Sequence, residues 1–130
     1  MHTPLLPEGW PPPKGYANGV LTQGTQTIFI GGQIGWNAQG VFESRDFTDQ
    51  VRQTLTNIRE VLASAGAGPE HMARMTWYIT DKQAYVNNLR GVGTAYREVM
   101  GKNFPSMSVV QVSALVEDEA LVEIEVTAVK

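Results

Sequence analysis

The chain has 130 residues, of which 42% are hydrophobic, so it holds enough apolar material for one packed domain and is too short for two. Its formal net charge is -3 and its ten basic residues are scattered, which argues against nucleic acid as a partner. No cysteine is present, and this excludes disulfides, thiolate nucleophiles and cysteine-based metal sites. We therefore expect a single domain over residues 1–130.

The N-terminal segment shows no targeting signal and a strong bias against helix. It has no basic region followed by an apolar run, as a signal peptide would have. The chain nowhere approaches the roughly 20 apolar residues of a transmembrane helix, so we expect a cytoplasmic protein with no membrane partner. Residues 4–16 contain five prolines and two glycines. This composition predicts an extended arm over residues 1–15 that lies across the domain.

Two short apolar segments follow the arm. Residues 19–23 and 27–31 are rich in Val, Leu, Ile and Phe, and the turn-prone residues 24–26 separate them, which predicts a β-hairpin. Gly31 and Gly32 stand at the end of the second strand. Successive glycines let another group approach the backbone closely, so this strand end either holds a ligand or turns a corner.

Helical periodicity occurs twice in the middle of the chain. Between residues 46 and 65 apolar residues recur every three or four positions, which predicts a helix that Gly66 terminates. A strand with period-two alternation is predicted over residues 73–80. Asp81 can cap a second helix, which continues to Gly101. Two glycines inside that helix allow either close packing or a bend, namely Gly91 and Gly93.

The chain ends in two further strand patterns, residues 107–115 and 121–129, joined by an acidic turn. They predict a second hairpin. The resulting order ββαβαββ indicates an α+β fold of two layers, in which two helices cover one face of a single sheet. The other face is polar with interspersed apolar groups, so it meets either water or copies of itself.

Four blocks of the sequence resemble, in order, those of one family. Residues 15–24 (GYANGVLTQG) are similar to its opening GPYSQA, and residues 28–34 (IFIGGQI) to its FVSGQI block. Residues 50–58 (QVRQTLTNI) resemble its QTRQALNL helix, and residues 110–115 (VQVSAL) with 122–125 (VEIE) resemble its closing blocks. This is the Rid family, also called YjgF, whose best-understood members are small trimers that hydrolyse reactive imines and enamines to ketones and ammonia. The resemblance implies a chorismate-mutase-like fold with a mixed sheet, a homotrimer with sites shared between chains, a small-molecule ligand and no cofactor.

The departures from the family pattern concern its binding site. In deaminating members an arginine near the start of the penultimate strand holds the substrate carboxylate, and a glutamate on the last strand is proposed to position the attacking water. By alignment Met107 replaces the arginine and Glu123 retains the glutamate. A thioether supplies neither charge nor a hydrogen-bond donor, so a 2-imino acid loses its main anchor. The family's cleft asparagine aligns with Gly93, which indicates a rebuilt pocket.

The resemblance therefore nominates Glu123 as the catalytic residue, with a role in a subunit interface as the alternative. Tyr16 and Met107 are cleft candidates that ordinary packing would also explain. Trp36 either covers a ligand or fills a subunit seam. The substrate-binding candidates are Tyr16, Gly31, Gly32, Trp36, Met107 and Val109.

The sequence shows no pattern of metal ligands, and the basic residues that could replace the positive charge of the missing arginine are scattered. His2 and His71 are too far apart and too poorly accompanied to indicate a metal site, and none is predicted. Positive charge near the cleft would have to come from another residue, with Arg45 and Lys102 as candidates.

These observations predict a hydrolytic deaminase that acts on an imine or enamine. The standard short 2-imino acid is not the expected substrate, because Met107 replaces the arginine; a neutral substrate, or one that carries its carboxylate elsewhere, fits better. The alternative is a non-catalytic trimeric protein that binds a metabolite in the same cleft. Some relatives are described as ribonucleases, an activity against which the acidic balance of this chain argues.

Overall fold

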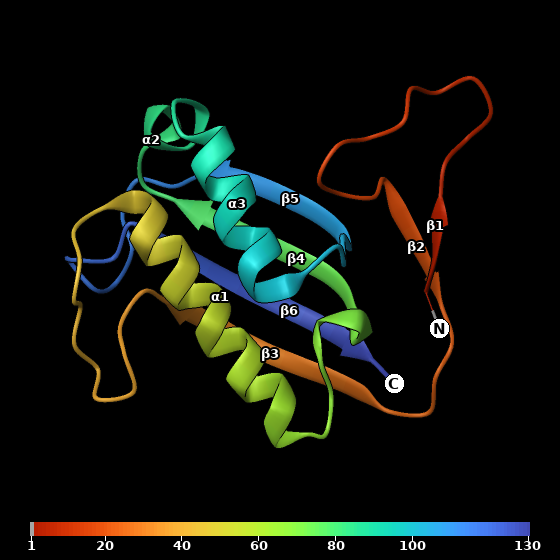
Figure 1. Cartoon of the computed structure of the whole chain (residues 1–130), viewed down its shortest axis with the longest axis horizontal. Helices are drawn as coiled ribbons and strands as arrows, with labels where there is room; N and C mark the ends of the chain where they lie inside the picture. The colour runs from red at the N-terminus through yellow and green to blue at the C-terminus, as the bar shows by residue number, and fades with distance from the viewer. Residues whose placement is uncertain (1) are drawn as a thin grey trace.

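A four-stranded mixed β-sheet with helices on one face forms the body of the protein in the computed structural model, which describes residues 2–130 (Figure 1). The strand order is β3-β6-β4-β5, in which β4 and β5 are parallel and the other neighbours antiparallel. The expected α+β fold with a mixed sheet is confirmed. In chain order the elements are β1 (His2–Leu5), β2 (Gly19–Thr22), β3 (Thr27–Ile34), α1 (Phe47–Ser64), the 3-10 helix η1 (Pro69–His71), β4 (Met72–Ile79), α2 (Lys82–Val86), α3 (Leu89–Met100), β5 (Ser106–Gln111) and β6 (Val122–Val129).

Alternate side chains of the two central strands build the core. Ile124 and Val126 of β6 are at most 3% exposed, and they stand beside the equally buried Trp77 and Met75 of β4. Burying each such side chain contributes about 1.5–3 kcal/mol, so this surface fixes the position of the helix that covers it. That helix is α1, whose apolar stripe is fully buried and consists of Val51, Leu55, Ile58 and Leu62.

Side-chain caps begin the predicted helices. The carboxylate of Asp46 accepts a hydrogen bond from the backbone N–H of Asp49 at 3.0 Å, and that of Asp81 accepts one from Gln83 at 2.9 Å. The second helix, expected to be continuous, divides into α2 and α3 at Asn88. The side-chain amide of Asn88 bonds back to the preceding turn at 2.8 Å, which competes with continuation of the helix.

The two glycines of α3 do not interrupt it. Both lie inside the helix. A Cβ on Gly91 would lie 3.5 Å from the side chain of Thr48 on α1. Of the two alternatives, close packing of α3 against α1 is therefore the one that the structure supports.

The expected hairpin of residues 107–115 and 121–129 is wrong. β6 lies between β3 and β4, and β5 pairs in parallel with β4 at the edge of the sheet. Composition explains the arrangement, because the inner side chains of β6 are all buried, as a central strand requires. β5 carries Ser106, Ser108 and Gln111, which remain partly or fully exposed at the edge.

The expected hairpin of residues 19–23 and 27–31 is also wrong, because β2 pairs with β1 and not with β3. The backbone N–H groups of Thr25 and Gln26 donate to the carbonyl of Lys130 at 3.0 and 2.9 Å. The segment between the two strands is thus bound to the C-terminal residue and does not close a tight turn.

The N-terminal arm contains a strand and stands beside the sheet, not across it (Figure 1). Pro4 of β1 lies opposite Val20 of β2. A two-stranded ribbon has two free edges, so the missing N–H of a proline is tolerated there. Ala17 ties the arm to the start of β5, because its N–H donates to the carbonyl of Pro105 at 3.0 Å.

A buried glutamine joins the helix layer to one end of the sheet. Gln50 of α1 is 1% exposed, and its amide donates to the carbonyls of Ser44 and Glu119 at 3.0 and 2.9 Å. The side-chain carbonyl oxygen of Gln50, Oε1, accepts a hydrogen bond from the backbone N–H of Leu121 at 2.8 Å. Gly35 packs directly against it, since a Cβ there would lie 2.8 Å from the Cβ of Gln50. One side chain therefore holds both the end of β3 and the start of β6 on α1.

The variant Gln50→Met keeps the side-chain volume but removes the side-chain partner of three backbone groups that are hydrogen-bonded to the buried amide. We expect the free energy of unfolding to fall by about 3 kcal/mol, because an unpaired buried polar group costs roughly 1–3 kcal/mol. Chemical denaturation measures the change. Gln53→Met, on the same helix but partly exposed, is the control and should change stability by less than about 0.5 kcal/mol. Equal losses in the two variants would contradict the role of Gln50.

Candidate functional site

The predicted site residues divide between the two faces of the sheet. Met107 stands beside the buried Met75 in the β4–β5 pair, so it faces the helices. Glu123 stands beside Tyr78 in the β4–β6 pair, on the opposite, open face. Side chains that alternate along a strand point to opposite faces. The positions that align with the family's arginine and glutamate therefore do not meet within one chain.

Tyr16 and Met107 come together in a cavity of about 430 Å³ between α3, the sheet and residues 14–16. We call this cavity the α3 pocket. Gly93 and Arg97 of α3 also form part of its wall, as does Lys14. The structure thus brings the position that aligns with the lost asparagine, Gly93, next to the position that aligns with the lost arginine.

Aromatic rings give the α3 pocket a rigid and uncharged wall. Trp77 and Tyr85 pack edge to face with ring centroids 6.2 Å apart, and Tyr96 and Phe104 stack at 5.4 Å. The Tyr96 hydroxyl donates to the carbonyl of Asn103. Burial raises the pKa of Tyr85 and of Tyr96, so both phenols stay neutral.

Arg97 is the cation that the sequence analysis missed. It lies one helical turn after Gly93, and a Cβ on Gly93 would lie 3.3 Å from Arg97 Nη1, so the guanidinium rests against the glycine. Of the two cations considered from sequence, Arg45 pairs with Glu119 at 3.4 Å, and Lys102 borders a different cavity. The spacing of four residues between the glycine and the arginine was the available signal, since such positions are neighbours on a helix.

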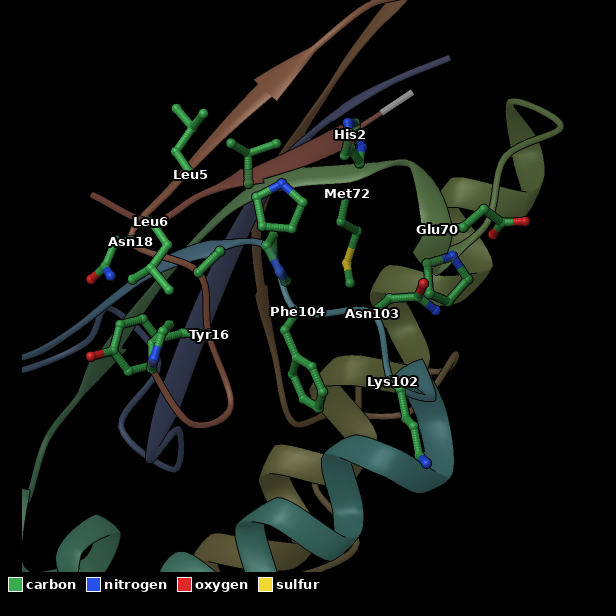
Figure 2. Close-up of a pocket in the computed structure, with 16 residues that line it drawn as sticks. His2, Leu5, Leu6, Tyr16, Asn18, Glu70, Met72, Lys102, Asn103 and Phe104 are labelled. Carbon is green, nitrogen blue, oxygen red and sulfur yellow. The ribbon is translucent and has the colours of Figure 1, made fainter. Parts of the chain in front are cut away.

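That other cavity, of about 520 Å³, separates the arm from the body of the protein (Figure 2). His2, Leu5 and Leu6 of the arm lie on one side of it, and Phe104 lies on the other. Tyr16 and Phe104 line this cavity as well as the α3 pocket, so the two cavities adjoin. The position of the arm therefore determines one wall of the α3 pocket.

On the open face, Glu123 lies over a β-bulge. Gly31 and Gly32 of β3 together stand opposite Glu125 of β6, because the register shifts at this point. A Cβ on Gly32 would lie 2.6 Å from Cδ of Glu123, whereas a Cβ on Gly31 would meet nothing within 4 Å. The carboxyl group of Glu123 thus occupies space that a residue larger than glycine would fill.

The neighbouring glutamate of β6 is engaged in a hydrogen bond. The hydroxyl of Tyr78 donates to the Glu125 carboxylate at 2.7 Å. This bond is the main cause that raises the pKa of Tyr78, and the negative charges of Glu125 and Glu123 raise it further, so the phenol remains a donor. Within residues 2–130, the Glu123 carboxylate itself makes no hydrogen bond and no ion pair.

Trp36 and Val109 belong neither to the wall of the α3 pocket nor to the residues around Glu123 on the open face. The carbonyl of Trp36 accepts a hydrogen bond from the side-chain amide of Asn57 at 2.8 Å, and its ring lies 5.8 Å from that of Phe42. Val109 stands beside Trp77 in the sheet and packs against the core, but it is not part of the wall of the α3 pocket. Trp36 is therefore bound to α1 just beyond the end of β3, and Val109 packs against the core; the binding roles expected for both residues stay predictions.

Neither a group of metal-ligating side chains nor a membrane-spanning helix is found among the described residues. Across residues 2–130, no three His, Cys, Asp or Glu side chains are grouped so that they could hold a metal ion. His2 contacts the Thr22 hydroxyl at 2.7 Å, and the Nδ1 of His71 accepts from the N–H of Gly68 at 3.0 Å. None of the described helices is long and apolar enough to cross a bilayer.

Comparison with known proteins assigns the family. A family model described as Endoribonuclease L-PSP matches residues 11–130. The structure of YyfB from Yersinia pestis, a member of the Rid protein family, superposes with a TM-score of 0.88 at 32% identity over 99% of this chain and 98% of that one. The chain belongs to the Rid family. The resemblance seen in its sequence blocks is confirmed.

Two further relatives are described together with small imino or amino acids. A 2-iminobutanoate/2-iminopropanoate deaminase of Capra hircus is 32% identical over 116 residues, which cover 88% of this chain and 80% of the relative. The structure of TdcF from Escherichia coli, which contains bound serine, has a TM-score of 0.69 at 30% identity over 94% of this chain and 91% of that one. At nearly equal identity, YyfB and TdcF thus differ in how completely their backbones follow that of this chain.

The packing of the Glu123 carboxylate against Gly32 can be tested by substituting Gly32 and, as a control, Gly31. We expect Gly32→Ala to displace the Glu123 carboxylate and to lower the free energy of unfolding by about 1–3 kcal/mol, because the new methyl group overpacks the site. Gly31→Ala should change stability by less than about 0.5 kcal/mol. The carboxyl ¹³C chemical shift of Glu123, assigned with Glu123→Gln, reports the displacement. A shift that stays unchanged in Gly32→Ala would contradict the packing described.

Proposed function

We propose that this protein hydrolyses the C=N bond of an imine, or of the imine tautomer of an enamine, to a carbonyl compound and ammonia. The observation that carries the proposal is the position of the Glu123 carboxylate. It is half-buried, packs against Gly32 and has no hydrogen-bond or ion-pair partner in residues 2–130. Rid relatives named as imine deaminases support the same chemistry.

The reaction needs a water molecule to be oriented and a proton to be moved. The carbon of a protonated imine is electrophilic, so a carboxylate that takes a proton from water provides general-base catalysis. The water oxygen bonds to this carbon while the C=N π electrons move to nitrogen, which gives an amino alcohol. Glu123 accepts the water proton in this step and returns it to the nitrogen, which makes ammonia the leaving group. As the C–N bond breaks and the carbonyl forms, the Glu123 carboxylate takes the hydroxyl proton, which then passes to ammonia and gives ammonium.

A complete site in this proposal needs a second copy of the chain. Glu123 and Met107 lie on opposite faces of one sheet, so the α3 pocket of one protomer has to meet the open face of a neighbour. The open face offers an apolar contact for this purpose, because Phe29 is 80% exposed on it. We therefore include a homotrimer, the assembly that the Rid resemblance implies, in the proposed function.

The role of Glu123 is tested by Glu123→Gln, with Glu125→Gln as a control that removes the same charge from the same strand. We expect the first variant to lose about 10²–10⁴-fold in kcat, the usual contribution of a general base, and the second to lose little. A coupled assay for ammonia and ketone follows freshly generated imines of acidic and neutral amino compounds. Equal turnover by the wild type and Glu123→Gln would remove Glu123 from the mechanism.

The exclusion of short 2-imino acids is tested by Met107→Arg, with Met107→Leu as the apolar control. A guanidinium at this position restores a charged partner for the carboxylate, which is worth about 1.5–3 kcal/mol, so kcat/KM for 2-iminopropanoate should rise about tenfold or more. Met107→Leu should leave it unchanged. If the wild type already processes 2-iminopropanoate as fast as Met107→Arg does, the argument from Met107 is wrong.

A non-catalytic metabolite-binding protein is the second candidate. The observation that favours it is the composition of the α3 pocket, whose described wall contains no carboxylate that could act as a base. In that case Glu123→Gln leaves the properties of the pocket unchanged, and the wild type releases no ammonia above buffer from any imine.

Cleavage of RNA is not part of the proposal, although the family model is described as an endoribonuclease. The net charge of -3 disfavours a polyanion. On the open face Glu123 and Glu125, which repel phosphate, accompany Arg74. In the described wall of the α3 pocket the only cations are Lys14 and Arg97.

A further inference from the structure

We propose that the α3 pocket binds an organic carboxylate with an aromatic or branched apolar body, and that Arg97 holds the carboxylate group. Arg97 would thus provide the positive charge that Met107 does not. The identification of this ligand as the substrate rests on the proposed function, whereas the binding itself does not.

The first argument is the position of the guanidinium. It lies against Gly93, where a Cβ would come within 3.3 Å of Nη1, and it shares the wall of one cavity with Met107. A larger residue at Gly93 would press on the guanidinium. The glycine therefore allows Arg97 to lie along the helix surface at the pocket, where it can present paired N–H donors to a carboxylate.

The second argument is that Arg97 has no acidic partner among residues 2–130. Among residues 2–130, Arg52 forms ion pairs with Asp49 and Glu98 at 3.3 and 2.9 Å, and no carboxylate lies within 4.0 Å of Arg97. Glu98, the next residue on the helix, is therefore already engaged. Lys14 adds a second positive charge to the wall of the pocket. Two cations beside a wall without carboxylates attract an anion.

The third argument is the apolar character of the remaining wall. Trp77, Tyr85 and Phe104 present ring surfaces there, and Met107 adds a flexible thioether. The phenols of Tyr85 and Tyr96 carry no negative charge, because burial raises their pKa. The volume of about 430 Å³ lies within the range of small-molecule sites, about 300–1,000 Å³.

Together these features define the ligand class. Arg97 and Lys14 are exposed, whereas Trp77 is 1% exposed, so the charge belongs at the mouth and the apolar body inside. A short 2-imino acid, whose carboxylate adjoins its imine carbon, cannot separate these two parts. A longer acid, in which an apolar segment separates the carboxylate from the reacting group, can occupy both.

The test is isothermal titration calorimetry with 3-phenylpropanoate and its neutral analogue 3-phenylpropanamide, on the full chain. We expect the wild type to bind the acid at least tenfold more tightly than the amide. Arg97→Gln should abolish this preference, and Arg97→Lys should retain part of it. Arg90→Gln is the matched control, because it removes the same charge from an arginine of α3 outside the wall of the pocket, and it should keep the preference.

Equal affinities of acid and amide for the wild type would overturn the proposal. So would a preference that survives in Arg97→Gln, or the absence of binding of both probes at millimolar concentration. If the wild type binds the acid but releases no ammonia from any imine, the proposed function fails and the carboxylate site stands. If it releases ammonia but shows no preference for the acid over the amide, the proposed function stands and the carboxylate site fails.

Discussion

The buried amide of Gln50 is the interaction on which the rest of the structure depends. It bonds to the carbonyl of Glu119 and the N–H of Leu121, and so fixes the point at which the chain enters β6. β6 can then run between β3 and β4, which places Glu123 over Gly32 on one side and beside Tyr78 on the other. A single hydrogen-bonded side chain inside the helix layer thereby sets the geometry of the opposite face of the sheet.

Local patterns were sufficient for the elements but not for their partners. The helix α1 and the alternation of β4 and β6 follow from the spacing of apolar residues, which burial selects directly. Both expected hairpins failed because turn-prone residues do not specify which strands pair. Thr25 and Gln26 bond to the carbonyl of Lys130, a contact between residues about a hundred positions apart that no local pattern contains. The strand β1 was missed because a proline such as Pro4 argues against a strand unless the strand lies at an edge, which local sequence does not reveal.

The candidate site was predictable where it follows family blocks and unpredictable where it depends on three-dimensional neighbours. Tyr16 and Met107 share one cavity, but Gly31, Gly32 and Glu123 lie on the other face. That division follows from the alternation of side chains along the strands, which places Met107 beside Met75 and Glu123 beside Tyr78. An exposed arginine on a helix resembles any solvated residue. The relevance of Arg97 becomes visible only once α3 is seen to lie across β4 and β5 (Figure 1).

The glycine pair of β3 has a consequence for solubility. Within residues 2–130, β3 pairs with β6 on one side only, so its other edge presents unpaired backbone groups. Such an edge is a template for aggregation through added strands, and β3 itself contains no proline, lysine or other charged residue to block it. The bulge at Gly31 and Gly32 twists the strand and breaks its regular ladder in the middle. The feature that seats a carboxylate on the open face thus also shortens the continuous edge to which a foreign strand could attach.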